Sequence, residues 1–234
     1  MEGHSEWRAK LALACYIALV GGIFAGSIAL ALVSFGFGID VLDPPFPIAF
    51  ISIPINEAII LVITLLFARH KGASLEKLGL KRAGFRTLAI VAVAALPLIL
   101  LVSGISIGEE MLFGPDPTAE LLEKALTPRN SLQLIIMIAL NLVLVGPCEE
   151  LAFRGFVQRG FENSFGKVQG LLLASGLFGL LHGLNTVYAI VPLVVGGLVL
   201  GFVWQRTGGN TTVSALMHGV YNSIALALAY FLTV

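Results

Sequence analysis

Charged residues are scarce in this sequence. Asp, Glu, Lys and Arg make up only 12% of the 234 residues, whereas hydrophobic residues make up 57%. A soluble domain is usually about a quarter charged. The formal net charge is zero, and the sequence contains neither a basic cluster among aromatic residues nor a glycine-rich phosphate loop. Composition therefore argues against a nucleic-acid partner.

Cysteine is also rare, so a disulfide framework is not expected. The two cysteines, Cys15 and Cys148, both lie in hydrophobic runs. A cleaved signal peptide is not expected either. The run from Leu11 to Phe37 carries no charge and is longer than the roughly 7–15 residues of a signal-peptide core. We therefore interpret this run as a retained first membrane span.

Long uncharged stretches dominate the rest of the chain. Crossing a bilayer takes about 20 apolar residues, and these must be helical because lipid offers no hydrogen-bond partners to the backbone. The sequence predicts an all-α, polytopic transmembrane bundle forming a single domain over 1–234. About seven spans are expected, at 11–35, 47–68, 87–107, 131–157, 168–184, 187–204 and 212–233.

The distribution of basic residues predicts the orientation of these spans. All of the 14 Lys and Arg residues except Lys124 and Arg129 fall on one side if the N-terminus is inside. Because basic residues favour the cytoplasmic side, we expect an N-in, C-out orientation. We separately expect a multi-pass protein of a prokaryotic plasma membrane. Two surface helices are also predicted, one capped by Ser74 and one starting at 116–118.

Two adjacent glutamates end the fourth predicted span. Arg154 follows Glu150 by four residues, so the two side chains share a helix face and can neutralise each other. Glu149 points elsewhere and has no local counter-charge. An ionisable side chain inside a membrane is costly, about 2.5–3.5 kcal/mol on insertion scales, and is functional by default. Glu149 is therefore a candidate general base.

Two later spans each carry a pair of candidate residues spaced four positions apart. Phe178 and His182 lie on the fifth span, and His218 and Asn222 lie on the seventh. Each pair presents two side chains from one helix face. Taken alone, each histidine is equally well explained as a residue that forms a hydrogen bond between helices. Asn222 alone would be explained in the same way, and Phe178 as a packing residue. Together with Glu149, they predict one polar chamber that is open to the cytosol.

Two other residues are also candidates for a function. Cys148 could be a nucleophile, but buried thiols more often serve as small apolar groups. Glu57 lies midway along the second span, at the same insertion cost as Glu149. The sequence leaves open whether Glu57 bonds to another span or lines the chamber.

The ordered motifs resemble those of a known family, the CPBP proteins, which comprise type II CAAX prenyl endopeptidases and the bacteriocin-processing (Abi) relatives. The resemblance covers 131–233. The motifs that carry it are Glu149-Glu150-x-x-x-Arg154, Phe178-x-x-x-His182 and His218-x-x-x-Asn222. It implies a helical bundle with a cytosol-facing cavity, in which Glu150 and Arg154 hold the helix geometry.

The resemblance also implies catalytic roles. Glu149 with His182 would activate a water that attacks the scissile carbonyl, and His218 with Asn222 would stabilise the oxyanion. A base, an orienting group and oxyanion donors suffice for amide hydrolysis without a covalent nucleophile. The expected partners are the bilayer and a peptide or protein substrate, prenylated or not.

The sequence does not decide whether the protein depends on a metal, and it leaves two other functions open. Glu149, His182 and His218 form a His₂Glu set of the type that holds zinc, but no H-E-x-x-H helix is present, and the favoured reading requires no cofactor. The main rival is a non-enzymatic immunity or scaffold protein of the same family. A small proton-coupled transporter is the second rival, although the paired repeats typical of transporters are not seen.

Overall fold

The helices follow the predicted spans closely. The computed structural model describes residues 7–40 and 46–233, and over these residues it contains helices and no strand. The first half forms α1 (Ala9–Gly36), α2 (Phe46–His70), α3 (Phe85–Phe113) and the short α4 (Ala119–Leu126). The second half forms α5 (Ser131–Leu140), η1 (Asn141–Val145), α6 (Gly146–Glu150), η2 (Leu151–Gln158), α7 (Arg159–Phe165), α8 (Lys167–His182), η3 (Val187–Ala189), α9 (Ile190–Arg206) and α10 (Thr211–Thr233).

Six helices in the described part of the chain are long and apolar enough to cross a membrane. They include the continuous 35-residue helix Ser131–Phe165, which runs from α5 through α7. The predicted fifth span corresponds to α8, whose 16 residues extend roughly 24 Å, less than a hydrocarbon core of about 30 Å. The all-α membrane bundle is confirmed, and the N-in, C-out orientation stays a prediction.

The segments predicted to lie inside meet at one end of the bundle. The Trp7 indole donates to the Phe156 carbonyl at 2.8 Å, which joins the start of α1 to η2. Lys81 Nζ donates to the Gly208 carbonyl at 3.0 Å, and the backbone amide of Thr211 donates to the Gly79 carbonyl at 2.7 Å. These contacts tie the 71–84 connection to the start of α10.

The 71–84 connection differs from its predicted form. The Ser74 hydroxyl accepts from the Lys77 amide at 3.2 Å, as a cap would, but the chain forms turns here and no helix. Gly79 adopts φ +87°, and Leu78 is fully buried. The connection thus inserts Leu78 into the bundle, where its carbonyl accepts from the Thr211 hydroxyl at 2.6 Å. This tertiary anchoring explains why the turn does not continue as a helix.

The opposite end is joined by a different contact. The Thr186 hydroxyl donates to Asp116 Oδ2 at 2.7 Å, which links the segment before α4 to the turn between α8 and α9. Asp116 Oδ1 accepts from the amide of Thr118 at 2.9 Å, and α4 follows directly, as predicted. The segments predicted to lie outside therefore also gather at one end.

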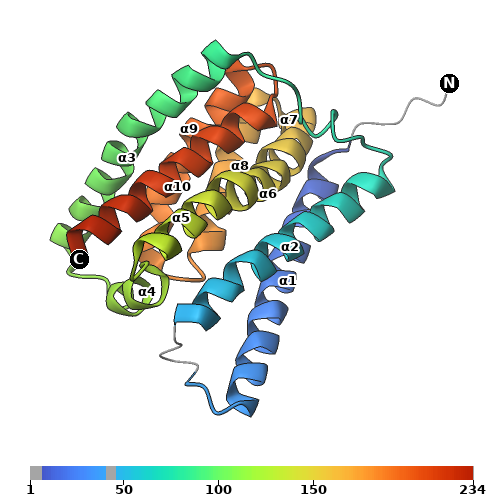
Figure 1. Cartoon of the computed structure of the whole chain (residues 1–234). Helices are drawn as coiled ribbons and strands as arrows, with labels where there is room; N and C mark the ends of the chain where they lie inside the picture. The colour runs from blue at the N-terminus through green and yellow to red at the C-terminus, as the bar shows by residue number, and fades with distance from the viewer. Residues whose placement is uncertain (1–6, 41–45, 234) are drawn as a thin grey trace.

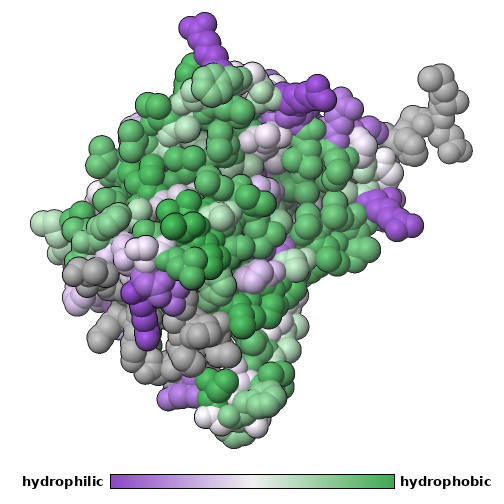
Figure 2. Space-filling view, in the orientation of Figure 1, coloured by the Kyte–Doolittle hydropathy of each residue, from purple (hydrophilic) through white to green (hydrophobic). Residues whose placement is uncertain are grey.

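The shape and surface of the molecule suit a lipid environment. The antiparallel α1–α2 hairpin lies along one side of the bundle, and α3, α9 and α10 lie on the other (Figure 1). In the same view, hydrophobic residues cover the middle of the visible face, while strongly hydrophilic ones gather toward its edges (Figure 2). Such a band is expected where side chains contact lipid.

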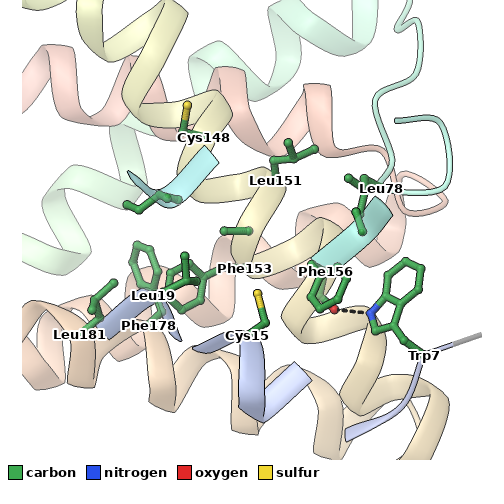
Figure 3. Packing of buried hydrophobic residues seen from close by; sticks show 13 residues of the cluster. Trp7, Cys15, Leu19, Leu78, Cys148, Leu151, Phe153, Phe156, Phe178 and Leu181 are labelled. Atoms are coloured by element: carbon green, nitrogen blue, oxygen red, sulfur yellow. Dashed lines mark hydrogen bonds between the residues drawn. The ribbon is translucent and has the colours of Figure 1, made fainter. Parts of the chain in front are cut away.

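The core lies where the hairpin meets the long α5–α7 helix and α8. Trp7 stacks on Phe156 with ring centroids 4.8 Å apart, and Phe153 packs edge-on against Phe178 at 5.0 Å. Cys15 and Leu19 of α1 complete the cluster (Figure 3). These contacts fix the long helix against α8, and therefore fix the position of the glutamates that the long helix carries.

Candidate active site

The two glutamates lie in a short α-helical stretch between two π-helical ones. Glu149 and Glu150 belong to α6, flanked by η1 and η2. Pro147 lacks an N–H, and its ring clashes with the carbonyl four residues earlier. This accounts for the widened turn before it. Such π-helical segments occur frequently at functional sites.

Two glycines let α10 approach this stretch closely. A Cβ on Gly146 would lie 2.6 Å from the Ala215 carbonyl oxygen, and one on Gly219 would lie 2.7 Å from the Asn141 carbonyl oxygen. Both distances are too short for a real methyl group, so only glycine fits at these crossings. The close approach brings His218 of α10 to the glutamates of α6.

A buried charge cluster anchors the site. Glu150 Oε1 lies 3.2 Å from Arg154 Nη1 and 3.1 Å from His218 Nδ1, and Glu150 is fully buried. Arg154 also donates to the Gly197 carbonyl at 3.1 Å. The predicted Glu150–Arg154 ion pair is therefore present. The additional contact between Glu150 and His218 was not predicted.

Glu149 faces both histidines. Its Oε2 lies 3.9 Å from His182 Nε2 and 3.9 Å from His218 Nε2. Three side chains predicted from separate spans are thus brought together. The side chain of His182 is 23% exposed, against 11% for Glu149 and 5% for His218. His182 therefore marks the accessible edge of the cluster.

The Nδ1 atom of each imidazole, on the side of the ring away from Glu149, has a defined partner. His182 Nδ1 lies 2.9 Å from the Phe178 carbonyl oxygen. A carbonyl only accepts, so Nδ1 carries the hydrogen, and the Nε2 of the neutral ring is an acceptor directed at Glu149. His218 Nδ1 faces the Glu150 carboxylate, which is ion-paired with Arg154. It too is the donor, which leaves Nε2 of each ring turned toward Glu149.

Phe178 forms the wall between the two histidines. Its ring centroid lies 4.7 Å from that of His182 and 5.8 Å from that of His218, and the Arg154 guanidinium lies 4.8 Å over its face. Figure 3 shows Phe178 within the core, near Phe153. A ring that contacts both imidazoles restricts their rotation, so Phe178 orients the site as well as packing it.

Asn222 lies at the margin of this arrangement. It follows His218 by one turn of α10 and is half-buried. Four-residue spacing places both side chains on one face, about 6 Å apart along the axis. Within the described chain, no hydrogen bond fixes its amide. Its role as an oxyanion donor stays a prediction.

Glu57 is the site residue whose position the sequence left undecided. It is buried in α2 and interacts electrostatically with both Glu149 and Cys148. Its Oε2 is enclosed and makes no hydrogen bond to the described residues. Glu57 therefore approaches the cluster from the N-terminal half of the chain. The sequence drew attention to Glu57 because a carboxylate in the middle of a membrane span is costly. That cost does not reveal which residue Glu57 contacts.

Cys148 has the surroundings expected of an inert thiol. It is buried within the same apolar cluster as Leu151 and Phe153 (Figure 3). It is unpaired. Burial among apolar groups disfavours a thiolate, which agrees with the packing interpretation of this residue.

The geometry also tests the zinc set. Tetrahedral zinc with bonds near 2.0–2.2 Å requires neighbouring ligand atoms roughly 3.4 Å apart. Glu149 lies 3.9 Å from each histidine, and no three His, Cys, Asp or Glu residues within the described ranges are arranged to hold a metal ion. As they stand, these side chains do not fit a zinc ion, and we derive no step through a metal.

Comparison with known proteins shows a family similarity in the second half of the chain. Residues 131–224 match the family model described as type II CAAX prenyl endopeptidase Rce1-like. This match contains all of the motif residues and supports the assignment to the CPBP family of CAAX-type proteases. An uncharacterized protein of Mycoplasma capricolum is 31% identical over 96 residues, which are 41% of this chain and 28% of that protein. The matched region thus spans little more than a quarter of that relative.

Proposed function

We propose that this integral membrane protein of the CAAX-protease family is an intramembrane endopeptidase that hydrolyses a peptide bond with an activated water. The observation that carries the proposal is the convergence of Glu149 with His182 and His218, at 3.9 Å from each. This distance is too long for a direct hydrogen bond. In the proposed mechanism, a water molecule that enters with the substrate would bridge Glu149 and an imidazole.

Glu149 and His182 would orient and activate this water. Both groups accept, because Glu149 Oε2 has no protein donor among the described residues and His182 has its hydrogen on Nδ1. A water that donates to both has its lone pair free for attack on a carbonyl carbon. In the attack, Glu149 takes the proton as the oxygen–carbon bond forms, and it returns that proton to the leaving amine.

His218 and Asn222 would stabilise the oxyanion. Because Nδ1 of His218 already donates to Glu150, Nε2 can donate to an oxyanion only if the ring is protonated. The Glu150 carboxylate, 3.1 Å from Nδ1, holds the ring in this orientation. The Asn222 amide, one turn away on the same helix, would supply a second donor. The proposed chamber opens to the cytosol, in keeping with the predicted orientation.

Peptide cleavage by the purified protein tests this function. A panel of prenylated and unprenylated peptides is incubated with the parent and with Glu149→Gln and His182→Ala, each with and without a zinc chelator. We expect cleavage by the parent alone, insensitive to chelator. Equal cleavage by correctly inserted variants would overturn the mechanism, and loss with chelator would establish a metal enzyme.

Full function of the Glu149→Gln protein in cells would instead favour a non-enzymatic immunity or scaffold role. The amide preserves hydrogen bonding within the bundle but cannot act as a base.

A further inference from the structure

A basic pocket lies at the end of the bundle where the basic connections gather. It has a volume of about 360 Å³ and is lined by Trp7, Arg8, Lys10, Leu11 and Lys71. The three cations come from the start of α1 and from the segment just after α2. Among the residues that the structure describes, no acidic residue lines the pocket and none of the three cations forms an ion pair. The pocket is therefore complementary to an anion.

The wall of this pocket is held in place by Trp7. The indole stacks on Phe156 and donates to the Phe156 carbonyl at 2.8 Å (Figure 3). The Trp7 carbonyl in turn accepts from Asn163 at 3.0 Å. Trp7 thus fixes the backbone that carries Arg8 and Lys10, so these cations project from an ordered segment rather than from a loose terminus.

An apolar groove begins at the same lysine. Its volume is about 560 Å³, and Lys10 lines it together with residues of α1, α7 and α8, including Leu13, Phe161, Phe165, Leu173, Gly176 and Leu180. Along α8 it runs from Leu172 to Leu180, roughly 12 Å at helical rise. The groove therefore leads from the basic pocket into the part of the bundle that faces lipid.

Gly176 keeps the groove open. A Cβ at this position would meet no atom within 4 Å, so glycine is not required there by a helix crossing. A large side chain at position 176 would instead occupy the groove. This makes Gly176 the point at which the groove can be blocked without disturbing the packing of α8.

We propose that the pocket and the groove together form a binding site for one anionic phospholipid. Arg8, Lys10 and Lys71 bind the phosphate through charge-assisted hydrogen bonds, and an acyl chain lies in the groove along α8. Basic pockets between membrane helices on the cytoplasmic side bind such headgroups, and each cation near an anionic surface contributes about 1 kcal/mol. A zwitterionic lipid carries its own cation and gains little from this pocket.

Lipid binding to the full-length protein in detergent tests the proposal by native mass spectrometry. Phosphatidylglycerol is compared with phosphatidylcholine of the same chains. We expect tighter binding of phosphatidylglycerol, weakened about fivefold by Lys10→Gln and again by Lys71→Gln, as 1 kcal/mol per cation implies. Arg86→Gln removes an exposed cation of α3 outside the pocket and should leave binding unchanged. Equal affinity for the two lipids, or equal loss in the Arg86 variant, would overturn the basic pocket as the headgroup site.

The groove is tested separately with Gly176→Phe. We expect this variant to lose the preferred lipid, whereas Gly104→Phe, on α3 and also in open space, retains it. Unchanged binding by Gly176→Phe would overturn the acyl-chain assignment. Glycerol 1-phosphate, added in excess, should displace the lipid poorly because it lacks the chain. Full displacement by this soluble anion would show a phosphate site without a lipid groove and would equally overturn the proposal.

Discussion

His218 Nδ1 lies 3.1 Å from Glu150 Oε1, and this contact joins the ion pair of the long helix to the candidate catalytic cluster. Glu150 thereby holds two positively charged or chargeable groups, Arg154 and His218, while it is fully buried. The adjacent Glu149 faces the opposite nitrogen of the same imidazole. The two neighbouring glutamates therefore divide the two nitrogens of His218 between them.

The division predicts different consequences for changes at the two glutamates. Glu149→Gln should lower kcat by at least about 100-fold, because the amide cannot accept the proton of the attacking water. Its thermal stability should stay near that of the parent. Glu110→Gln, which alters an exposed glutamate at the end of α3, serves as the control. Peptide cleavage rates and unfolding temperatures of the three proteins test this, and a fully active Glu149→Gln variant would contradict it.

Glu150→Leu should instead destabilise the fold. Removal of one partner from a buried ion pair leaves Arg154 without compensation, at a cost of about 3–5 kcal/mol. The double variant Glu150→Leu with Arg154→Met removes both charges and should recover much of this loss, although not activity, since His218 then lacks its anchor. Thermal unfolding of the single and double variants decides the matter. A double variant no more stable than Glu150→Leu would show that the ion pair is not the source of the effect.

The sequence was sufficient to predict the helical membrane bundle and the approach of Glu149, His182 and His218 to one another, whereas their catalytic roles stay predictions. Hydrophobic runs define membrane helices because lipid leaves the backbone no alternative. The cost of Glu149, His182 and His218 within such runs marks them for a polar cluster. Helical spacing also paired Glu150 with Arg154, since that interaction is local. These inferences succeeded because each depends on one helix or on one strong physical penalty.

Contacts between helices could not be predicted in the same way. The approach of Glu57 to Glu149 depends on how α2 packs against α6, and the His218–Glu150 contact depends on the close crossing at Gly146 and Gly219. Glycine in a membrane helix indicates close packing without naming the partner. The turn after Ser74 was missed for a related reason, because burial of Leu78 overrides local helix capping.

Gly219→Ala tests the close crossing of α10. The added methyl would lie 2.7 Å from the Asn141 carbonyl oxygen, so α10 must move and carry His218 away from the glutamates. Overpacking of this kind costs about 1–3 kcal/mol, and cleavage should fall with stability. Gly108→Ala on α3 is the matched control, because its Cβ would meet nothing within 4 Å. Equal stability and activity for the two variants would mean that the crossing does not position the site.

Asp116 should make the far end of the bundle sensitive to acid. Burial alone would raise the pKa of this carboxyl, but hydrogen bonds from the Thr118 amide and from the hydroxyls of Thr186 and Thr118 outweigh it, so the pKa lies below its ordinary value of 3.8. A lowered pKa stabilises the fold above pH 3.8, and the contribution disappears as the pH falls through the folded-state value.

Unfolding temperatures of Asp116→Asn and the parent test this set of hydrogen bonds to Asp116. They are measured from neutral pH down to below pH 3.8. We expect a small deficit in the variant at neutral pH that shrinks as the parent carboxylate is protonated. Glu76→Gln removes an exposed carboxylate at the opposite end and should show no such convergence. A difference in unfolding temperature that does not depend on pH would show that the effect comes from altered hydrogen-bond geometry rather than from the lost charge.

Glu57→Leu should separate stability from activity. The Glu57 carboxyl is buried, and its Oε2 makes no hydrogen bond to the described residues, so the parent bears the desolvation cost of an unsatisfied polar group, about 1–3 kcal/mol. Leucine fills a similar volume without that cost, and the unfolding temperature should rise. If Glu57 shapes the electrostatic environment of Glu149, cleavage should fall in the same variant, as expected where a site retains costly groups for function. A more stable and fully active Glu57→Leu protein would exclude Glu57 from the chemistry, and a destabilised one would show that the carboxyl has a structural partner.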